Sequence, residues 1–181
     1  MLGPRVGAAR QVAQASLARP QRRWTSSARQ VPDVTLAIIK PTVCVYEPNI
    51  LHALRRLREH PSLQILRAKS FAWEEEDAAQ FYAEHLGKFY YDRLILGMTA
   101  GRAIGLALSG PGAITEWRKL IGPTKAYRSA WEAPSCLRAE LGMGDTRNGF
   151  HGSDSDESAL RELGLVFPEW DAHGWLEKAR M

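Results

Sequence analysis

The order of strand-like and helix-like segments predicts an α+β fold, with a ferredoxin-like four-stranded antiparallel sheet and helices on one of its faces. From residue 34 onward these segments alternate as β-α-β-α-β-α-β, and no internal repeat interrupts them. The 181 residues are 45% hydrophobic and 24% charged, which is typical of one globular domain with its own core. We therefore expect a single folded domain.

Strands are marked by short hydrophobic runs rich in β-branched residues. We expect the first at residues 34–39, which are hydrophobic on both faces, as in a central strand covered by helices. Lys40 and Pro41 end this strand. The other three strands of the predicted sheet are expected at residues 63–73, 103–108 and 148–152.

Helices are indicated by apolar residues three or four positions apart. Residues 49–59 space Ile50, Leu54 and Leu57 in this way, and Pro61 closes the segment. The acidic residues 74–77 stand where a helix N-terminus favours carboxylates. Further helices are expected at residues 78–86, 90–98, 113–121 and 156–167, while residues 122–147 are expected to be irregular.

The first 30 residues differ in charge from the rest of the chain. They hold six arginines, several Ser and Thr residues and no acid, because the first acid is Asp33. This pattern is typical of a mitochondrial transit peptide, although a retained basic tail would share it. We expect a leader at residues 1–30, cleaved between Arg22 and Gln30, a folded domain at residues 31–181, and a location in the mitochondrial matrix.

Several classes of protein are disfavoured. Without the six leader arginines, 18 basic and 20 acidic residues remain, so the high pI does not indicate nucleic-acid binding. No apolar run approaches the roughly 18 residues of a membrane-spanning helix. Cys44 and Cys136 lack a CxxC spacing, which argues against a disulfide framework or a zinc site. Four histidines show no ligand spacing and are expected on the surface: His52, His60, His85 and His173.

The histidine at the end of the last predicted strand is a candidate nucleophile. His151 is followed by Gly152 and Ser153, and Glu162 lies about two turns into the next helix. A neutral imidazole is a usable nucleophile when a hydrogen bond at one ring nitrogen fixes the tautomer. Glu162 can supply that bond. The same residues also fit an ordinary histidine at a strand end.

Five separated segments, spread over about residues 35–167, resemble those of the nucleoside diphosphate kinases. AIIKPT resembles the family's strand-one motif, in which a lysine follows the strand, and RNGFHGSDSDESA resembles its active-site signature NxxHGSD. Between them, FYAEHLGKFYYDRL, MTAGRAIGLALSG and EWRKLIGPT are similar to its cleft helices, third strand and arginine-to-threonine segment. With its leader, the chain resembles the divergent mitochondrial branch of the family.

The resemblance implies a ping-pong phosphotransfer, in which His151 attacks the γ-phosphate of an NTP through Nδ1 and passes it on to an NDP. Glu162 and Ser153 match residues that orient the ring and assist transfer, and Tyr82 matches a tyrosine beside the histidine. Mg²⁺ is expected to be coordinated by the nucleotide phosphates, with few or no protein ligands. The matched nucleotide-binding positions are Lys40, Tyr90, Arg118, Thr124, Arg138 and Asn148.

Two of these residues also have an ordinary structural interpretation. Arg118 fits a solvated helix face, and Tyr82, with its neighbour Phe81, fits a pair of core aromatics at helical spacing. Their roles in the cleft therefore rest on the resemblance.

The chain departs from the family pattern at several positions. Thr42 replaces a carboxylate, Tyr90 replaces a base-stacking phenylalanine, and Asp145 replaces a small apolar residue against the base's other face. The 13 residues between Thr124 and Arg138 exceed the usual loop, which argues against the family's common hexamer. Two hypotheses follow: a mitochondrial kinase that supplies NTPs, or a catalytically weak homologue that works bound to a protein partner in the matrix.

Overall fold

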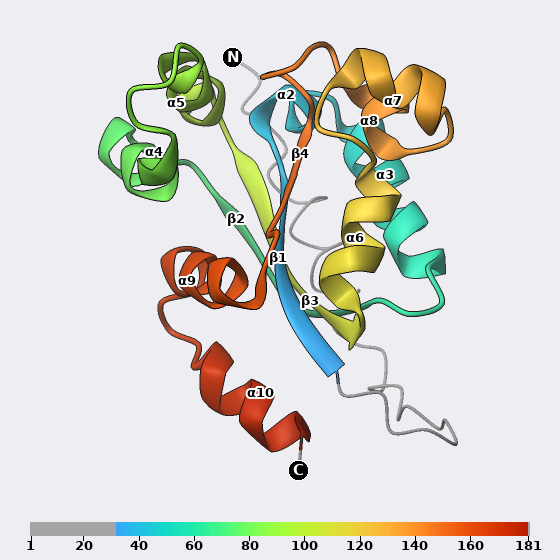
Figure 1. The fold of residues 1–181 in the computed structure, drawn as a ribbon, viewed down its shortest axis with the longest axis vertical. Helices are drawn as coiled ribbons and strands as arrows, with labels where there is room; N and C mark the ends of the chain where they lie inside the picture. Colours follow the sequence, from blue (N-terminus) through green and yellow to red (C-terminus); the bar gives the residue numbers. More distant parts are fainter. Residues whose placement is uncertain (1–31, 181) are drawn as a thin grey trace, which may run out of the picture.

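The computed structural model describes residues 32–180, and the predicted leader at residues 1–30 lies outside them. One sheet has the strand order β2-β3-β1-β4, with each neighbouring pair antiparallel (Figure 1). The predicted α+β fold is therefore confirmed. The strands lie close to their predicted positions: β1 (Pro32–Ile39), β2 (Gln64–Phe71), β3 (Ala103–Pro111) and β4 (Phe150–Gly152).

Five helices lie at or near predicted segments. They are α3 (Glu47–Glu59), α4 (Glu75–Phe81), α5 (Tyr91–Thr99), α6 (Ala113–Ile121) and α9 (Asp156–Val166), and a 3₁₀ turn, η1 (Ala83–His85), follows α4. The helix expected at residues 78–86 is therefore divided into the end of α4 and this 3₁₀ turn. Within the described residues, no helix has the length and apolar character needed to cross a bilayer.

The expectation of an irregular segment at residues 122–147 is wrong. Two short helices form there, α7 (Ala126–Glu132) and α8 (Leu137–Leu141). Elements of seven and five residues are too short to show a clear helical period in the sequence. Two more helices were also not predicted: α2 (Pro41–Cys44) and α10 (Ala172–Arg180).

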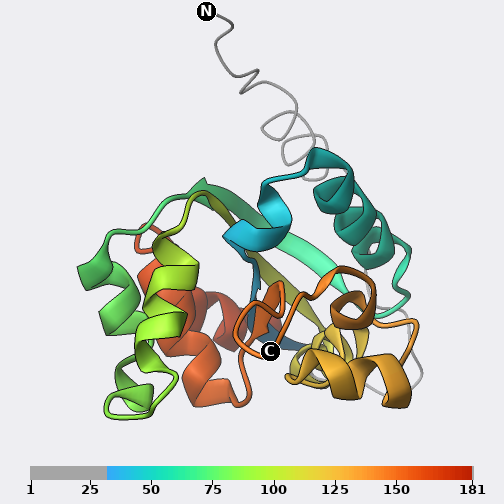
Figure 2. The same cartoon turned by 90° about the horizontal axis from the view of Figure 1, so that it is seen from above.

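Helices cover both faces of the sheet, which corrects the expectation of one covered face (Figure 2). Successive residues of a strand point to opposite faces. Ala37 and Ile39 of β1 therefore pack with α3 and α6, whereas Leu36 and Ile38 pack with α4, α9 and α10. This explains why the first strand is hydrophobic throughout, since each of its faces enters a core.

Pairing of β1 with β4 brings two distant sequence motifs together. His151 lies opposite Ile38 in the register, and the Lys40 N–H donates to the Gly149 carbonyl at 2.9 Å. Gly149 has φ of +79°, and a Cβ there would lie 2.8 Å from a methyl group of Val43, so only glycine fits this turn. Lys40 and His151 therefore meet at one end of the sheet.

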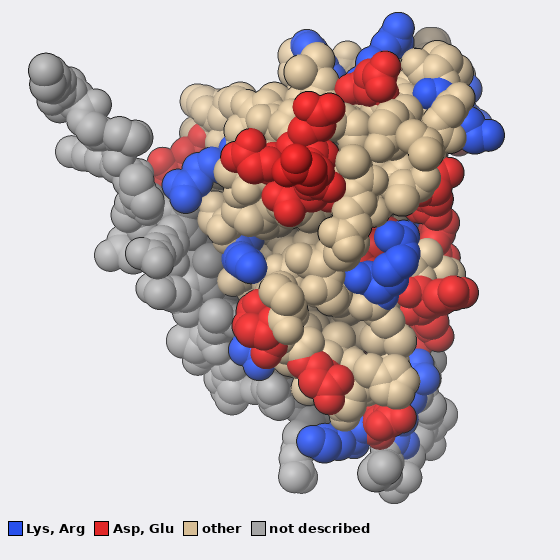
Figure 3. Space-filling view, turned by 90° about the vertical axis from the view of Figure 1, so that its left-hand side faces the viewer, with Lys and Arg blue, Asp and Glu red and all other residues tan. Residues whose placement is uncertain are grey.

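The acidic run at residues 74–77 is a helix start, as predicted. The Asp77 carboxylate accepts the Glu74 N–H at 3.0 Å, which satisfies one free donor at the N-terminus of α4. All four acidic side chains are exposed. Acidic groups gather on this side of the molecule (Figure 3), so the outer surface here does not attract anions.

Candidate active site

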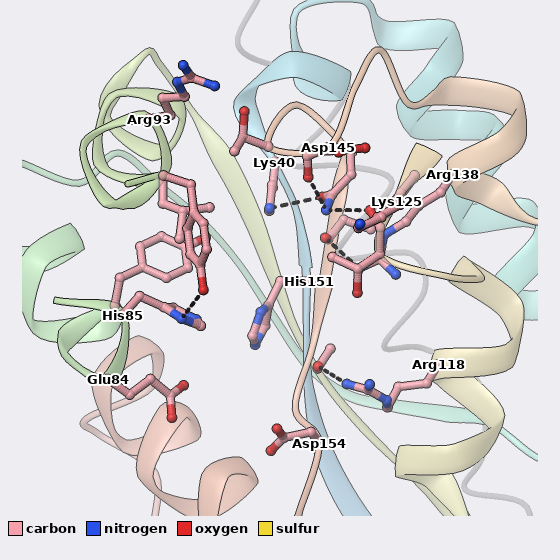
Figure 4. A pocket seen from close by; sticks show the side chains of 18 of the residues that line it. Lys40, Glu84, His85, Arg93, Arg118, Lys125, Arg138, Asp145, His151 and Asp154 are labelled. Atoms are coloured by element: carbon pink, nitrogen blue, oxygen red, sulfur yellow. Dashed lines mark hydrogen bonds between the residues drawn. The ribbon is translucent and has the colours of Figure 1, made fainter. Parts of the chain in front are cut away.

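A cleft of about 900 Å³ lies above the end of β1 and β4. One wall comes from Tyr82, η1 and α5, and the other from α6, α8 and the segment that precedes β4 (Figure 4). Of the ten residues predicted for the site, nine line this cleft, and Ser153 lies just behind it. Residues from five distant parts of the sequence therefore share one cavity.

The His151 imidazole is held by a buried carboxylate. Its Nε2 lies 2.8 Å from Oε2 of Glu162, and the Ser153 hydroxyl donates to the same oxygen at 2.7 Å. The Leu36 N–H donates to the Ser153 hydroxyl at 3.2 Å, which fixes that side chain in turn. Glu162 is only 3% exposed. A proton on Nε2, shared with the carboxylate, leaves the Nδ1 lone pair available as a nucleophile.

Phe81 and Tyr82 both lie near His151. The Phe81 ring meets the imidazole edge-on, with centroids 4.9 Å apart, and also meets the Tyr82 ring edge-on, while Tyr82 lines the same cleft as His151. The sequence alone predicts a core residue at Phe81, because the resemblance assigns a role in the cleft to its neighbour Tyr82 and none to Phe81. The Tyr82 hydroxyl is buried without a partner among the described residues, and burial raises the pKa of Tyr82, so the group is a donor.

Lys40 is a buried cation at the floor of the cleft. Its ammonium donates to Oδ1 of Asn148 at 3.0 Å, and burial, together with the charge of Arg138, lowers the pKa of Lys40 to about 7. The Asn148 amide nitrogen donates to the carbonyls of Thr124 and Asp145, each at 3.1 Å. Asn148 therefore ties the end of β1 to the opposite wall.

Two guanidinium groups share the same end of the cleft. Arg138 donates to the carbonyls of Gly122 and Phe150, and its buried Nε has no partner among the described residues. Arg118 donates to the Gly152 carbonyl at 3.3 Å. Burial and the charge of Arg118 lower the pKa of Arg138 to about 10, so Arg138 is charged at neutral pH. Such a pair suits a polyphosphate.

Aromatic side chains form the other end of the cleft. The Tyr90 hydroxyl lies 3.5 Å from Nδ1 of His85, and Phe89, which is 87% exposed, meets the Tyr90 ring edge-on. His85 is half-buried and lines the cleft, a position that the sequence pattern did not single out. Asp145 stands on the opposite wall (Figure 4). An aromatic base can stack on Tyr90, with the Asp145 carboxylate on the facing wall.

The remaining candidates lie outside the cleft. Cys44 donates to the Ile39 carbonyl, and burial raises the pKa of its thiol to about 12, which makes it a poor nucleophile. Cys136 is buried in the core. Across residues 32–180, no group of three or more His, Cys, Asp or Glu side chains is arranged to hold a metal ion.

Comparison with known proteins agrees with this geometry. The family model for nucleoside diphosphate kinase matches residues 33–172. Nucleoside diphosphate kinase 6 of Danio rerio is 43% identical over 143 residues, covering 79% of this chain and 81% of that protein. Nucleoside diphosphate kinase 6 of Homo sapiens is 40% identical over 149 residues, covering 82% and 80%.

A solved structure extends the comparison to the fold. A crystal structure of the Aquifex aeolicus nucleoside diphosphate kinase superposes with a TM-score of 0.72 at 32% identity, covering 75% of this chain and 95% of that one. The family match over residues 33–172 includes the four strands, apart from Pro32, and the cleft residues described above. This chain is therefore a divergent member of the nucleoside diphosphate kinase family.

Proposed function

We propose that this protein is a nucleoside diphosphate kinase that transfers the γ-phosphate of ATP, or of another NTP, to an NDP through a phosphohistidine on His151. One observation carries the proposal: the His151 imidazole is bonded through Nε2 to the buried Glu162 carboxylate at 2.8 Å, in the cleft that holds the Lys40 and Arg138 cations. The arrangement combines a fixed nucleophile with a site for a polyphosphate.

In the first half-reaction, the Nδ1 lone pair of His151 attacks the γ-phosphorus. The N–P bond forms as the bond from the γ-phosphorus to the bridging oxygen breaks, and the NDP leaves with that electron pair. Positive charge develops on the imidazole, and the Glu162 carboxylate at Nε2 stabilises it. In the second half-reaction, a terminal β-phosphate oxygen of the acceptor attacks the phosphorus, and the electrons of the N–P bond return to Nδ1.

The phosphate end of the cleft supplies donors and positive charge. Phosphoryl transfer spreads negative charge over the equatorial oxygens, so positioned cations stabilise it. The buried, unpartnered Tyr82 hydroxyl and Arg138 Nε–H are donors that nucleotide oxygens would satisfy. Because the phosphate end of the cleft is cationic, Mg²⁺ would bind to the nucleotide phosphates and not to the protein. There it would neutralise phosphate charge and keep most of its waters.

We also propose that the protein works in the mitochondrial matrix. Support comes from the six arginines and the absence of acids in residues 1–30. The NTPs formed there would serve nucleic-acid synthesis. Fusing residues 1–30 to a fluorescent protein tests the location: import with loss of the segment supports it, and a cytosolic signal of full length contradicts it.

A second candidate function is favoured by the segment between Thr124 and Arg138. Its helix α7 exposes Trp131 by 87% and Tyr127 by 57%, which is unusual for large aromatics on a monomer surface. Asp145 also removes an apolar contact to the base. In this alternative, the protein is a weak catalyst that acts through a protein partner in the matrix, and the common hexamer does not form.

Labelling distinguishes the two candidates. The full chain is incubated with γ-labelled ATP and Mg²⁺, beside His151→Ala and the matched variant His85→Ala, and unlabelled UDP is then added. The kinase predicts an acid-labile, base-stable label on the wild type and on His85→Ala but not on His151→Ala, with its discharge as UTP. A wild type that binds ADP in calorimetry but takes up no label would overturn autonomous catalysis.

A further inference from the structure

Among the described residues, no strand pairs with the outer edge of β4, and side chains bond to its backbone instead. The Phe150 and Gly152 carbonyls face outward, whereas the His151 carbonyl faces β1 in the register. β4 is the last strand in the sheet order and has three residues. Each of its carbonyls accepts a side-chain hydrogen bond: Phe150 from Arg138 at 3.1 Å, His151 from the Trp117 indole at 2.9 Å, and Gly152 from Arg118 at 3.3 Å. So short an edge strand depends on such bonds for its position.

Trp117 differs from the two arginines because it supports β4 from behind. It is 1% exposed, lies in the core beneath α6 and does not line the cleft. A Cβ on Gly152 would lie 2.5 Å from the indole, so the ring sits directly against the strand. Since neighbouring residues of a strand alternate, Gly152 and Phe150 face Trp117 while the His151 imidazole faces Phe81 and Glu162.

We propose that Trp117 is a positioning residue for the phosphotransfer, an inference that rests on the proposed function. The indole N–H holds the His151 carbonyl, and the ring blocks retreat of the strand into the core. The imidazole is thereby kept within reach of both Glu162 and the cleft. Without this bond the His151 carbonyl is no longer tied to the indole, the strand shifts away from the ring, and Nδ1 no longer aligns with the γ-phosphorus.

An isostere tests the hydrogen bond without changing the shape of the core. In the full chain, Trp117 is replaced by 3-benzothienylalanine, in which sulfur stands where the indole has N–H, and Trp117→Phe serves as the encoded variant. A misplacement of this kind lowers the rate of His151 phosphorylation by ATP by about 10-fold. The dissociation constant for ADP changes by less than about twofold, because Trp117 touches the lining of the cleft only at β4, whereas Lys40, Tyr90 and Asn148 lie on other segments. The same replacement at Trp175, half-buried on α10, is the matched control.

A second readout requires no turnover. In protein labelled with ¹⁵N-histidine, the Nε2–H of His151 is shielded by Glu162 and gives a slowly exchanging proton signal. We expect this signal to be lost in the Trp117 isostere and retained in the Trp175 control. An unchanged rate and signal would overturn the positioning role, as would equal losses of rate and ADP affinity. A wild type that shows the signal but forms no phosphohistidine refutes the proposed function and leaves the positioning role standing. Loss of the signal in the Trp117 isostere then supports that role, and its retention overturns it.

Discussion

Glu162 is the residue on which the nucleophile depends most directly. Its Oε2 accepts from both the His151 ring and the Ser153 hydroxyl, in a site that is almost closed to water. Glu162→Gln removes the charge that stabilises the developing imidazolium and offers the ring an amide N–H, which favours the wrong tautomer. We expect His151 phosphorylation to slow by about 100-fold, measured in a single turnover with labelled ATP.

A matched carboxylate controls for the change in cleft charge. Glu84 lines the same cleft, but its side chain is 60% exposed and makes no bond to the His151 ring. Glu84→Gln should keep the rate within about twofold. Equal losses in both variants would mean that cleft charge, and not the bond to His151, determines the rate.

Lys40 makes nucleotide binding depend on pH. Burial and Arg138 lower its pKa to about 7, so above pH 7 the free protein holds this amine largely neutral. Nucleotide phosphates favour the ammonium form, and binding therefore raises the pKa. ADP binding at pH 8 should take up nearly one proton, and ADP affinity should fall as pH rises through 7 and beyond.

Calorimetry in two buffers of different ionisation enthalpy measures the uptake at pH 8. Lys40→Met should lose both the uptake and most of the affinity. Lys125→Met, at the exposed rim of the same cleft, should keep the uptake. Proton uptake that survives in Lys40→Met would assign the titration to another group.

At the scale of elements, a helix could be predicted from the sequence when it is long enough to show a period and when glycine or proline marks its ends. α6 has the predicted bounds because a hydrophobic stripe runs through Ala113, Trp117 and Ile121 and because Gly112 and Gly122, both with positive φ, flank it. α7 and α8 offer one or two turns each, too few for a period to show. Both faces of β1 are hydrophobic, and this pattern indicated the second helical layer better than element order did.

The site shows a similar division. Motif residues such as His151 and Asn148 were found because their spacing in the sequence is distinctive. The contacts that hold them were not found. Arg138 and Trp117 bond to backbone carbonyls, and every residue type has a backbone carbonyl, so the sequence does not indicate these bonds. The approach of Phe81 to the imidazole likewise depends on how α4 packs against the sheet.

The short helix α8 depends on α3. α8 has five residues and carries Arg138 into the cleft, and a helix of this length is not stable alone. Arg56 of α3 donates to Glu140 and to the Ser135 carbonyl, each at 2.8 Å. Arg56→Met keeps the apolar stem but loses both bonds. We expect a loss of about 1 kcal/mol in the free energy of unfolding and a severalfold weaker affinity for ADP.

Urea denaturation and calorimetry measure the two effects. Arg58→Met is the control, because Arg58 is exposed on the same helix and makes no hydrogen bond or ion pair among the described residues. Loss of stability with full ADP affinity would show that α8 holds Arg138 in place without help from Arg56.

At the scale of the whole molecule, the sheet joins two helical layers and the cleft spans them. Tyr82 and Tyr90 stand on the wall of α4 and α5, while Arg118 and Arg138 stand on the wall of α6 and α8. A nucleotide that stacks on one wall and is neutralised by the other crosslinks both layers. Its binding energy is therefore added to the stability of the entire domain.

ADP at about 100 times its dissociation constant should raise the free energy of unfolding by about 2.7 kcal/mol, in one cooperative urea transition. Hydrogen exchange should slow in both α5 and α8, because a ligand bound to both walls of the cleft restrains the local opening of both helical layers. Adenosine at the same concentration reaches Tyr90 but lacks the phosphates that bridge to the arginines, so it should protect little. Protection confined to α5 with ADP would show that the phosphates do not engage the opposite wall.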